Sequence, residues 1–242
     1  MKERPILFSG PMVRAILEGR KTMTRRVVNT GRFKQDDWDI SPTSDGYRIF
    51  RGSKDDIVFN TACGRPARSM QDKIIRCPYG QPGDRLWVRE KFRRWLSPDH
   101  AGWIICYAAD GKVVYSDVQP EDDMDFFDEP KNWKPSIFMP RWSSRLLLEV
   151  TAVRVERVQD ISEADARAEG LSEITKDGRL FKYGIPDRDG LPGTDNDGWP
   201  WSEWTADPRQ AFRKLWNSIN AERGYGWDAN PWVWVVEFKS LV

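Results

Sequence analysis

The stretch Gly19-Arg20-Lys21-Thr22-Met23-Thr24-Arg25-Arg26 organises the expected fold, because it directly follows the first predicted helix. Residues 11–18 have the apolar spacing of a helix, and Gly19 can adopt the left-handed conformation that commonly ends one. A short helix with a firm end holds the residues after it in a fixed place. We therefore expect this stretch to be presented rigidly.

The residue types of this stretch suggest a binding or reactive site. Cations with hydroxyls between them can contact an anion or a nucleotide, and a lysine beside a threonine can act as a base and nucleophile pair. A basic run after a helix is, however, more commonly a solvated loop or a strand edge. The candidate residues are Lys21 and Thr24 for chemistry, and Arg20, Thr22, Arg25 and Arg26 for binding.

The composition argues against binding of duplex nucleic acid through overall charge. In 242 residues there are 38 Lys and Arg against 37 Asp and Glu, which leaves a net charge of +1. Any nucleic-acid contact must then be local. The 13 tryptophans suit either an aromatic core or a surface that stacks on bases. Core packing is the simpler explanation, since several of them alternate with valine.

The cysteines and the single histidine exclude several kinds of chemistry. Cys63, Cys77 and Cys106 are odd in number and widely spaced, which is unlike a disulfide framework or a zinc site and fits a reducing cytoplasm. His100 is the only histidine, so paired-histidine chemistry is excluded and a Ser-His-Asp triad would have to use it. The sequence has no 18-residue apolar run, so we expect a cytoplasmic protein without a membrane contact.

Strand and helix signals predict an α+β fold. Residues 85–90 and 232–239 have strand patterns, and residues 146–158 form a long strand whose apolar phase changes near Thr151, as at a β-bulge. Such a bend helps to close a small barrel. Asp110-Gly111 predicts a hairpin with a primed turn, and Asp207-Pro208 predicts the start of an amphipathic helix.

Long segments between these elements are interpreted as insertions into a single domain that spans residues 1–242. They cover approximately residues 29–76, 109–140 and 172–206, of which the last is expected to be a long loop. The first contains hairpin signals and the cations Arg65, Arg68, Lys73 and Arg76, and the second contains an acidic run at 121–129 that we expect to be an exposed loop.

Glu169 is expected in the last turn of a short helix that Ser162 caps and Gly170 ends. A carboxylate at that end opposes the helix dipole, so the position is mildly unfavourable unless a cation lies nearby. This local conflict makes Glu169 a candidate for a functional role, although an exposed glutamate explains it equally well.

These blocks together resemble the ASCH domain family, whose members share a small PUA-like β-barrel fold. The stretch Gly19-Arg20-Lys21-Thr22-x-Thr24 is similar to the family signature. Pro82-Gly83-Asp84 is similar to its Gly-Asp turn, Glu149-Val150-Thr151 and the helix ending at Leu171 to its central strand and helix, and residues 235–239 to its closing strand. The resemblance covers under half of the chain and implies a PUA-like barrel with flanking helices and long loop insertions, as in larger phage or prophage relatives.

The resemblance also implies an activity. Compact bacterial members are N4-acetylcytidine amidohydrolases, and their catalytic lysine, threonine and glutamate match Lys21, Thr24 and Glu169. The implied reaction is cleavage of the exocyclic amide of an acylated cytidine nucleoside, or of a modified RNA nucleotide, with neither a metal nor a cofactor. Met23 and Arg25 differ from the compact enzymes. Other ASCH and PUA-like domains bind RNA, and some are described as nucleases. Binding of single-stranded RNA, cleavage of RNA, and a phage accessory protein without chemistry are therefore the alternatives for this chain.

Overall fold

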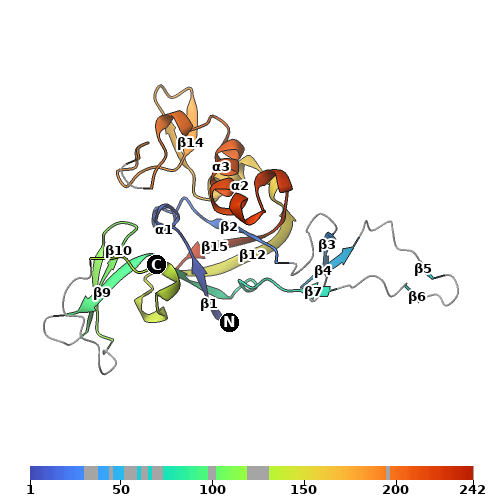
Figure 1. The fold of residues 1–242 in the computed structure, drawn as a ribbon, viewed down its shortest axis with the longest axis horizontal. Helices are drawn as coiled ribbons and strands as arrows, with labels where there is room; N and C mark the ends of the chain where they lie inside the picture. Colours follow the sequence, from blue (N-terminus) through green and yellow to red (C-terminus); the bar gives the residue numbers. More distant parts are fainter. Residues whose placement is uncertain are drawn as a thin grey trace.

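The computed structural model describes residues 1–29, 38–43, 46–51, 59–60, 65–66, 73–97, 102–118, 131–194 and 197–241. It is a mixed structure of α-helices and open β-sheets, and Figure 1 shows the α-helices on one side of the central sheet. The sequence predictions for Cys63, His100, Arg68 and the acidic run 121–129 lie outside the described residues.

The central sheet has five strands in the order β1-β8-β12-β15-β2. β1 and β8 are parallel, and each of the other neighbouring pairs is antiparallel. Segments far apart in the sequence thus meet in one sheet, since β2 pairs with β15. The strands are β1 (Glu3–Leu7), β8 (Arg85–Arg89), β12 (Leu147–Arg157), β15 (Trp232–Ser240) and β2 (Met23–Val27).

The long strand β12 contains the predicted bulge. Its register with β15 shifts between Val150 and Ala152, so the expected irregularity near Thr151 is confirmed. The extra residue lets the apolar side chains on both sides of the bulge face buried surroundings. β1 and β2 lie at the two edges of the sheet, and the strand ladders of the described residues do not join these two edges.

The helices begin where the sequence predicts. The Ser162 side chain accepts a hydrogen bond from the backbone N–H of Asp165, and the Asp207 side chain accepts one from that of Arg209. These caps satisfy backbone donors that have no partner within the helix. The α-helices are α1 (Gly10–Leu17), α2 (Glu163–Ala168) and α3 (Pro208–Asn220), and short 3-10 helices occupy Ser136–Phe138, Arg141–Ser143, Val158–Asp160, Trp201–Glu203, Ala221–Arg223 and Trp227–Ala229.

Smaller sheets extend the fold, and Figure 1 shows two of them on opposite sides of the central sheet. The predicted hairpin around Asp110-Gly111 is confirmed. Its turn is not of the primed type, because among the described residues other than glycine only Asn230 has a positive φ. The remaining strands are β3 (Trp38–Thr43), β4 (Gly46–Arg51), β5 (Phe59–Asn60), β6 (Arg65–Pro66), β7 (Lys73–Ile75), β9 (Phe92–Leu96), β10 (Trp103–Tyr107) and β11 (Val113–Ser116).

The interpretation of residues 172–206 as a long loop is wrong in part. β13 (Ser172–Thr175) and β14 (Phe181–Gly184) form an antiparallel hairpin within it. The ring of Trp204 lies so close to Gly184 that a Cβ atom there would be 2.5 Å from it. The hairpin is thereby held against a buried tryptophan. The glycines and aspartates that suggested a loop are in turns and in the segment that follows β14.

The main core fills the space between the central sheet, α1 and α3. Val13, Val150 and Val235 are almost completely buried there, and Phe212 and Trp216 of α3 join the same cluster. Apolar residues that recur every three or four positions in a helix, and every second position in a strand, create these buried faces. The packing fixes the ends of α1, β2 and α2, which carry the residues of interest.

Gly170 allows the end of α2 to approach α1 and Lys21 closely. It has a φ of +104°, and a Cβ atom there would lie 3.0 Å from the Cβ of Ala15 and 3.1 Å from that of Lys21. Any larger residue would therefore be strained both by its backbone and by its neighbours. The turn that places Glu169 beside Lys21 depends on this glycine.

Gly170→Ala is expected to lower the free energy of unfolding by about 3 kcal/mol, because backbone strain and overpacking add. Gly178→Ala is the matched control, since Gly178 also has a positive φ of +71° but has no atom within 4 Å of the added methyl. We expect it to cost about 1 kcal/mol. Urea unfolding measures both values, and equal losses would contradict the role of close packing at Gly170.

Candidate functional site

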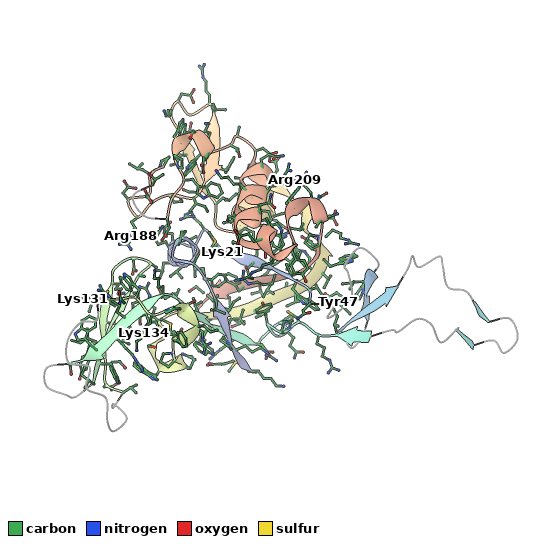
Figure 2. The ribbon with its side chains drawn as sticks, in the orientation of Figure 1. Lys21, Tyr47, Lys131, Lys134, Arg188 and Arg209 are labelled. Carbon is green, nitrogen blue, oxygen red and sulfur yellow. The ribbon has the colours of Figure 1, made fainter. Side chains whose placement is uncertain are left out.

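The basic stretch after α1 is not a solvated loop. Gly19 ends the helix with a φ of +74°, and β2 begins at Met23. Lys21 forms an isolated β-bridge with Glu169, which follows α2, and Figure 2 shows Lys21 between α1 and α3. Lys21 and Thr24 are 3% and 1% exposed. The solvated interpretation is therefore wrong for these two residues.

Lys21 and Glu169 form a buried ion pair. The Lys21 Nζ donates to Glu169 Oε2 at 2.8 Å and to the Glu169 backbone carbonyl at 2.6 Å. The two side chains are 2% and 5% exposed. Burying one charge alone is costly, whereas a pair with good geometry offsets much of that cost. The cation that the sequence analysis required for Glu169 at the end of α2 is thus Lys21.

Arg25 holds the other oxygen of the same carboxylate. Its guanidinium contacts Glu169 Oε1 at 3.3 Å, Asp165 at 2.8 Å and Glu156. Burial alone would lower the pKa of Arg25, but the carboxylates of Glu169 and Glu156 raise it overall. Glu169 is therefore fixed between two cations, of which Arg25 lies in β2 and Lys21 lies two residues before that strand.

Burial lowers the pKa of Lys21 below that of a free lysine. The attraction of Glu169 opposes this effect, and the nearby cations Arg26 and Arg25 add to it. A lysine ammonium with a lowered pKa gives up its proton more readily. The site thus combines an ion pair with a proton that is more acidic than usual.

Lys21, Thr24 and Glu169 line one cavity of about 730 Å³. The Thr24 side chain, which carries the only hydroxyl among these three residues, lies in the same lining as the ion pair. The volume lies in the range that holds a drug-sized molecule. Other residues that line the cavity are Phe8, Ser9, Met12, Arg25, Arg26, Tyr79, Ile185, Asp197, Trp199, Phe212, Leu215, Trp216, Ile219 and Tyr225.

The predicted binding residues fall into two groups. Arg25 and Arg26 line the cavity, and Arg26 also donates to the backbone carbonyl of Leu7 at 2.7 Å. Arg20 and Thr22 do not line it. Arg20 donates to Gly170 O at 2.6 Å and pairs with Glu18, and the Thr22 side chain is exposed. The prediction that these two residues bind substrate has no support in their placement.

Sequence reasoning missed several residues around the pair. Asp165 lies in the short helix without a sequence signal for a contact with Arg25, and Glu156 lies in a strand whose pattern carries no signal for a buried charge. The aromatic residues Phe8 and Phe212 lie next to the cations, with Lys21 Nζ 5.6 Å from the Phe8 ring centroid. Only the amphipathic stripe of α3 indicated that Phe212 would be buried.

Other kinds of site are not seen in the described part of the chain. Its His, Cys, Asp and Glu side chains include no group of three or more that could hold a metal ion. Cys77 and Cys106 are free thiols, and burial raises the pKa of Cys77 to about 11. None of the helices in the described ranges is both long and apolar enough to cross a bilayer.

Comparisons with family models, with curated proteins and with solved structures gave no match for this chain.

Arg25→Met is expected to lower the free energy of unfolding by about 3 kcal/mol, because it leaves Glu169, Asp165 and Glu156 without their shared cation. Arg154→Met is the matched control. Arg154 also contacts Asp165 and Glu156, but its side chain is 37% exposed.

We expect the Arg154→Met control to lower the free energy of unfolding by less than about 1 kcal/mol, since exposed ion pairs contribute little to stability. Thermal unfolding followed by circular dichroism compares the two variants. If Arg154→Met destabilised the protein as much as Arg25→Met, burial of the ion-pair network would not explain the loss of stability.

Proposed function

We propose that this protein hydrolyses the exocyclic N4-acyl amide of acylated cytidine nucleosides, which gives cytidine and a carboxylic acid. The observation that carries the proposal is the buried Lys21–Glu169 ion pair in a cavity that Thr24 also lines. Hydrolysis of an amide needs a nucleophile, a proton acceptor and a donor for the developing negative charge. These three residues supply one group of each kind.

The hydrogen bonds of Lys21 favour its role as a donor. An ammonium group has three N–H donors, and two of them point at the backbone carbonyl and the carboxylate of Glu169. One donor remains for the carbonyl oxygen of a substrate. Sequence reasoning left open whether Lys21 or Glu169 is the base. This arrangement favours Glu169 as the proton acceptor and Lys21 as the partner of the oxyanion.

The proposed reaction then proceeds in two stages. A water molecule that Thr24 orients, or the Thr24 hydroxyl itself, attacks the acyl carbonyl carbon, and Glu169 accepts the released proton. Lys21 stabilises the oxyanion. When the C–N bond breaks, the amine of cytidine takes up a proton, for which the acidified Lys21 is well placed. If Thr24 attacks first, water releases the acyl group in a second step.

Membership of the ASCH family, with its PUA-like barrel, is part of the same proposal. Two features support closure of the central sheet. The bulge between Val150 and Ala152 bends β12, and the Arg26 side chain bonds to Leu7 O across the two edge strands. A small barrel can be completed by such side-chain contacts where a strand ladder is interrupted.

Binding or cleavage of RNA through the basic stretch is the less favoured alternative. It needs cations that are open to phosphate. Lys21 and Arg25 are instead buried against carboxylates, and Arg20 is paired with Glu18. Three of the four cations of this stretch are therefore paired with carboxylates, which suits an uncharged amide better than a phosphate backbone.

Single substitutions test the reactive groups. Lys21→Met, Thr24→Val and Glu169→Gln are each expected to lower kcat/KM for N4-acetylcytidine by at least about 100-fold, since each removes a group that acts on the reacting atoms. The ultraviolet change on formation of cytidine follows the reaction.

Matched controls are Lys239→Met, Thr151→Val and Glu163→Gln, which change exposed residues of the same types. These variants are expected to keep full activity. Circular dichroism checks the fold of every variant. If all three folded site variants hydrolysed N4-acetylcytidine as fast as the unaltered protein, the proposal would be wrong.

The pH profile tests the assignment of the base. If Lys21 acts as the donor, kcat/KM falls as the pH rises through the pKa of Lys21, which burial places below that of a free lysine. If Lys21 were the base, kcat/KM would instead rise over the same range. Lys21→Arg should move any remaining alkaline limb to higher pH, because the guanidinium does not lose its proton there.

A further inference from the structure

One wall of the cavity is the apolar face of α3. Phe212, Leu215, Trp216 and Ile219 line the cavity, and their spacing by three and four positions places them on one side of the helix. Ile219 is 46% exposed, and Leu215 is only half-buried. Apolar surface of this helix therefore faces open space inside the cavity.

This wall starts beside the reactive groups and leads away from them. The guanidinium carbon of Arg25, which contacts Glu169, lies 5.8 Å from the centroid of the Phe212 ring. From Phe212 to Ile219 the helix advances by about 10 Å, at about 1.5 Å per residue. An apolar group attached to the reacting carbon can thus lie along about two helical turns.

The other side of the cavity has a different character. The Phe8 ring lies 5.6 Å from Lys21 Nζ and 5.2 Å from the guanidinium carbon of Arg26, measured to the ring centroid. Arg26 and Asp197 add charged groups among the lining residues. An aromatic ring with nearby polar groups suits a base and a ribose, whereas the four wall residues of α3 are apolar. Arg223, which follows the end of α3, adds a charge to the lining beyond that wall.

We propose that the α3 wall holds the acyl group, and that the substrates are N4-acylcytidines whose acyl chain has several carbons. This inference rests on the proposed function and names its substrate class. Apolar surface that a ligand removes from water favours binding in proportion to its area. Phe212 and Trp216 are almost completely buried, so the surface that a ligand can cover belongs mainly to Leu215 and Ile219. An acetyl group has a single methyl and leaves these two side chains in contact with water.

The chemistry is unchanged by a longer chain. The oxygen of water forms the new bond to the acyl carbon, the C–N bond breaks, and cytidine leaves with its amine carrying one proton from that water. The carboxylic acid is the second product. Contacts along the wall therefore determine which length of acyl chain is preferred, while Lys21, Thr24 and Glu169 carry out the cleavage of the amide.

A series of N4-acetyl-, N4-butanoyl- and N4-hexanoylcytidine tests the inference. We expect kcat/KM to rise about fourfold for each methylene that the wall covers, and the hexanoyl substrate to exceed the acetyl substrate by at least about tenfold. A flat or falling series would overturn the inference and leave the proposed function standing. Hydrolysis of none of them would overturn the proposed function itself.

Ile219→Ser tests the wall directly. It is expected to lower the ratio of hexanoyl to acetyl kcat/KM about fourfold, since it removes apolar contact from the end of the wall. Ile137→Ser is the matched control, because Ile137 is 59% exposed and lies outside the cavity. It should leave the ratio unchanged. If Ile219→Ser lowered kcat/KM equally for both substrates, the wall would not contact the acyl chain and the inference would be wrong.

Discussion

The ion pair between Lys21 and Glu169 is the constraint on which the rest of the candidate site depends. A buried lysine and a buried glutamate destabilise a fold unless each finds its partner, so α1, α2 and β2 must meet in one arrangement. Arg25 then adds a second cation to the carboxylate and ties it to Asp165. The position of Thr24 follows, because it is on the strand that carries Arg25.

Much of the fold could be predicted because it follows from local rules. Four features each have a signal within a few residues. They are the N-terminal caps of α2 and α3 at Ser162 and Asp207, the bulge in β12, and the hairpin at Asp110-Gly111. The hairpin of residues 172–184 was missed, because its glycines and charges resemble a loop and its contact with Trp204 is not local. Tertiary packing decides such segments.

The candidate site was only partly predictable, for the same reason. The family resemblance selected Lys21, Thr24 and Glu169, and the charge conflict at the end of α2 independently drew attention to Glu169. Charge alone misled for Arg20, whose partners are Glu18 and a backbone carbonyl. The sequence could not show that Lys21 and Arg25 face inward, because burial of a charge depends on partners up to 148 positions away.

The pairing of β2 with β15 has a consequence for how the protein becomes functional during synthesis. β2 lies near the start of the chain, yet its ladder partner is the final strand. On the ribosome, β2 cannot form this ladder until residues 232–240 have been synthesised. The cavity is therefore completed long after Lys21 and Arg25 have emerged, and a chain that lacks residues 232–240 would leave β2 without its ladder partner.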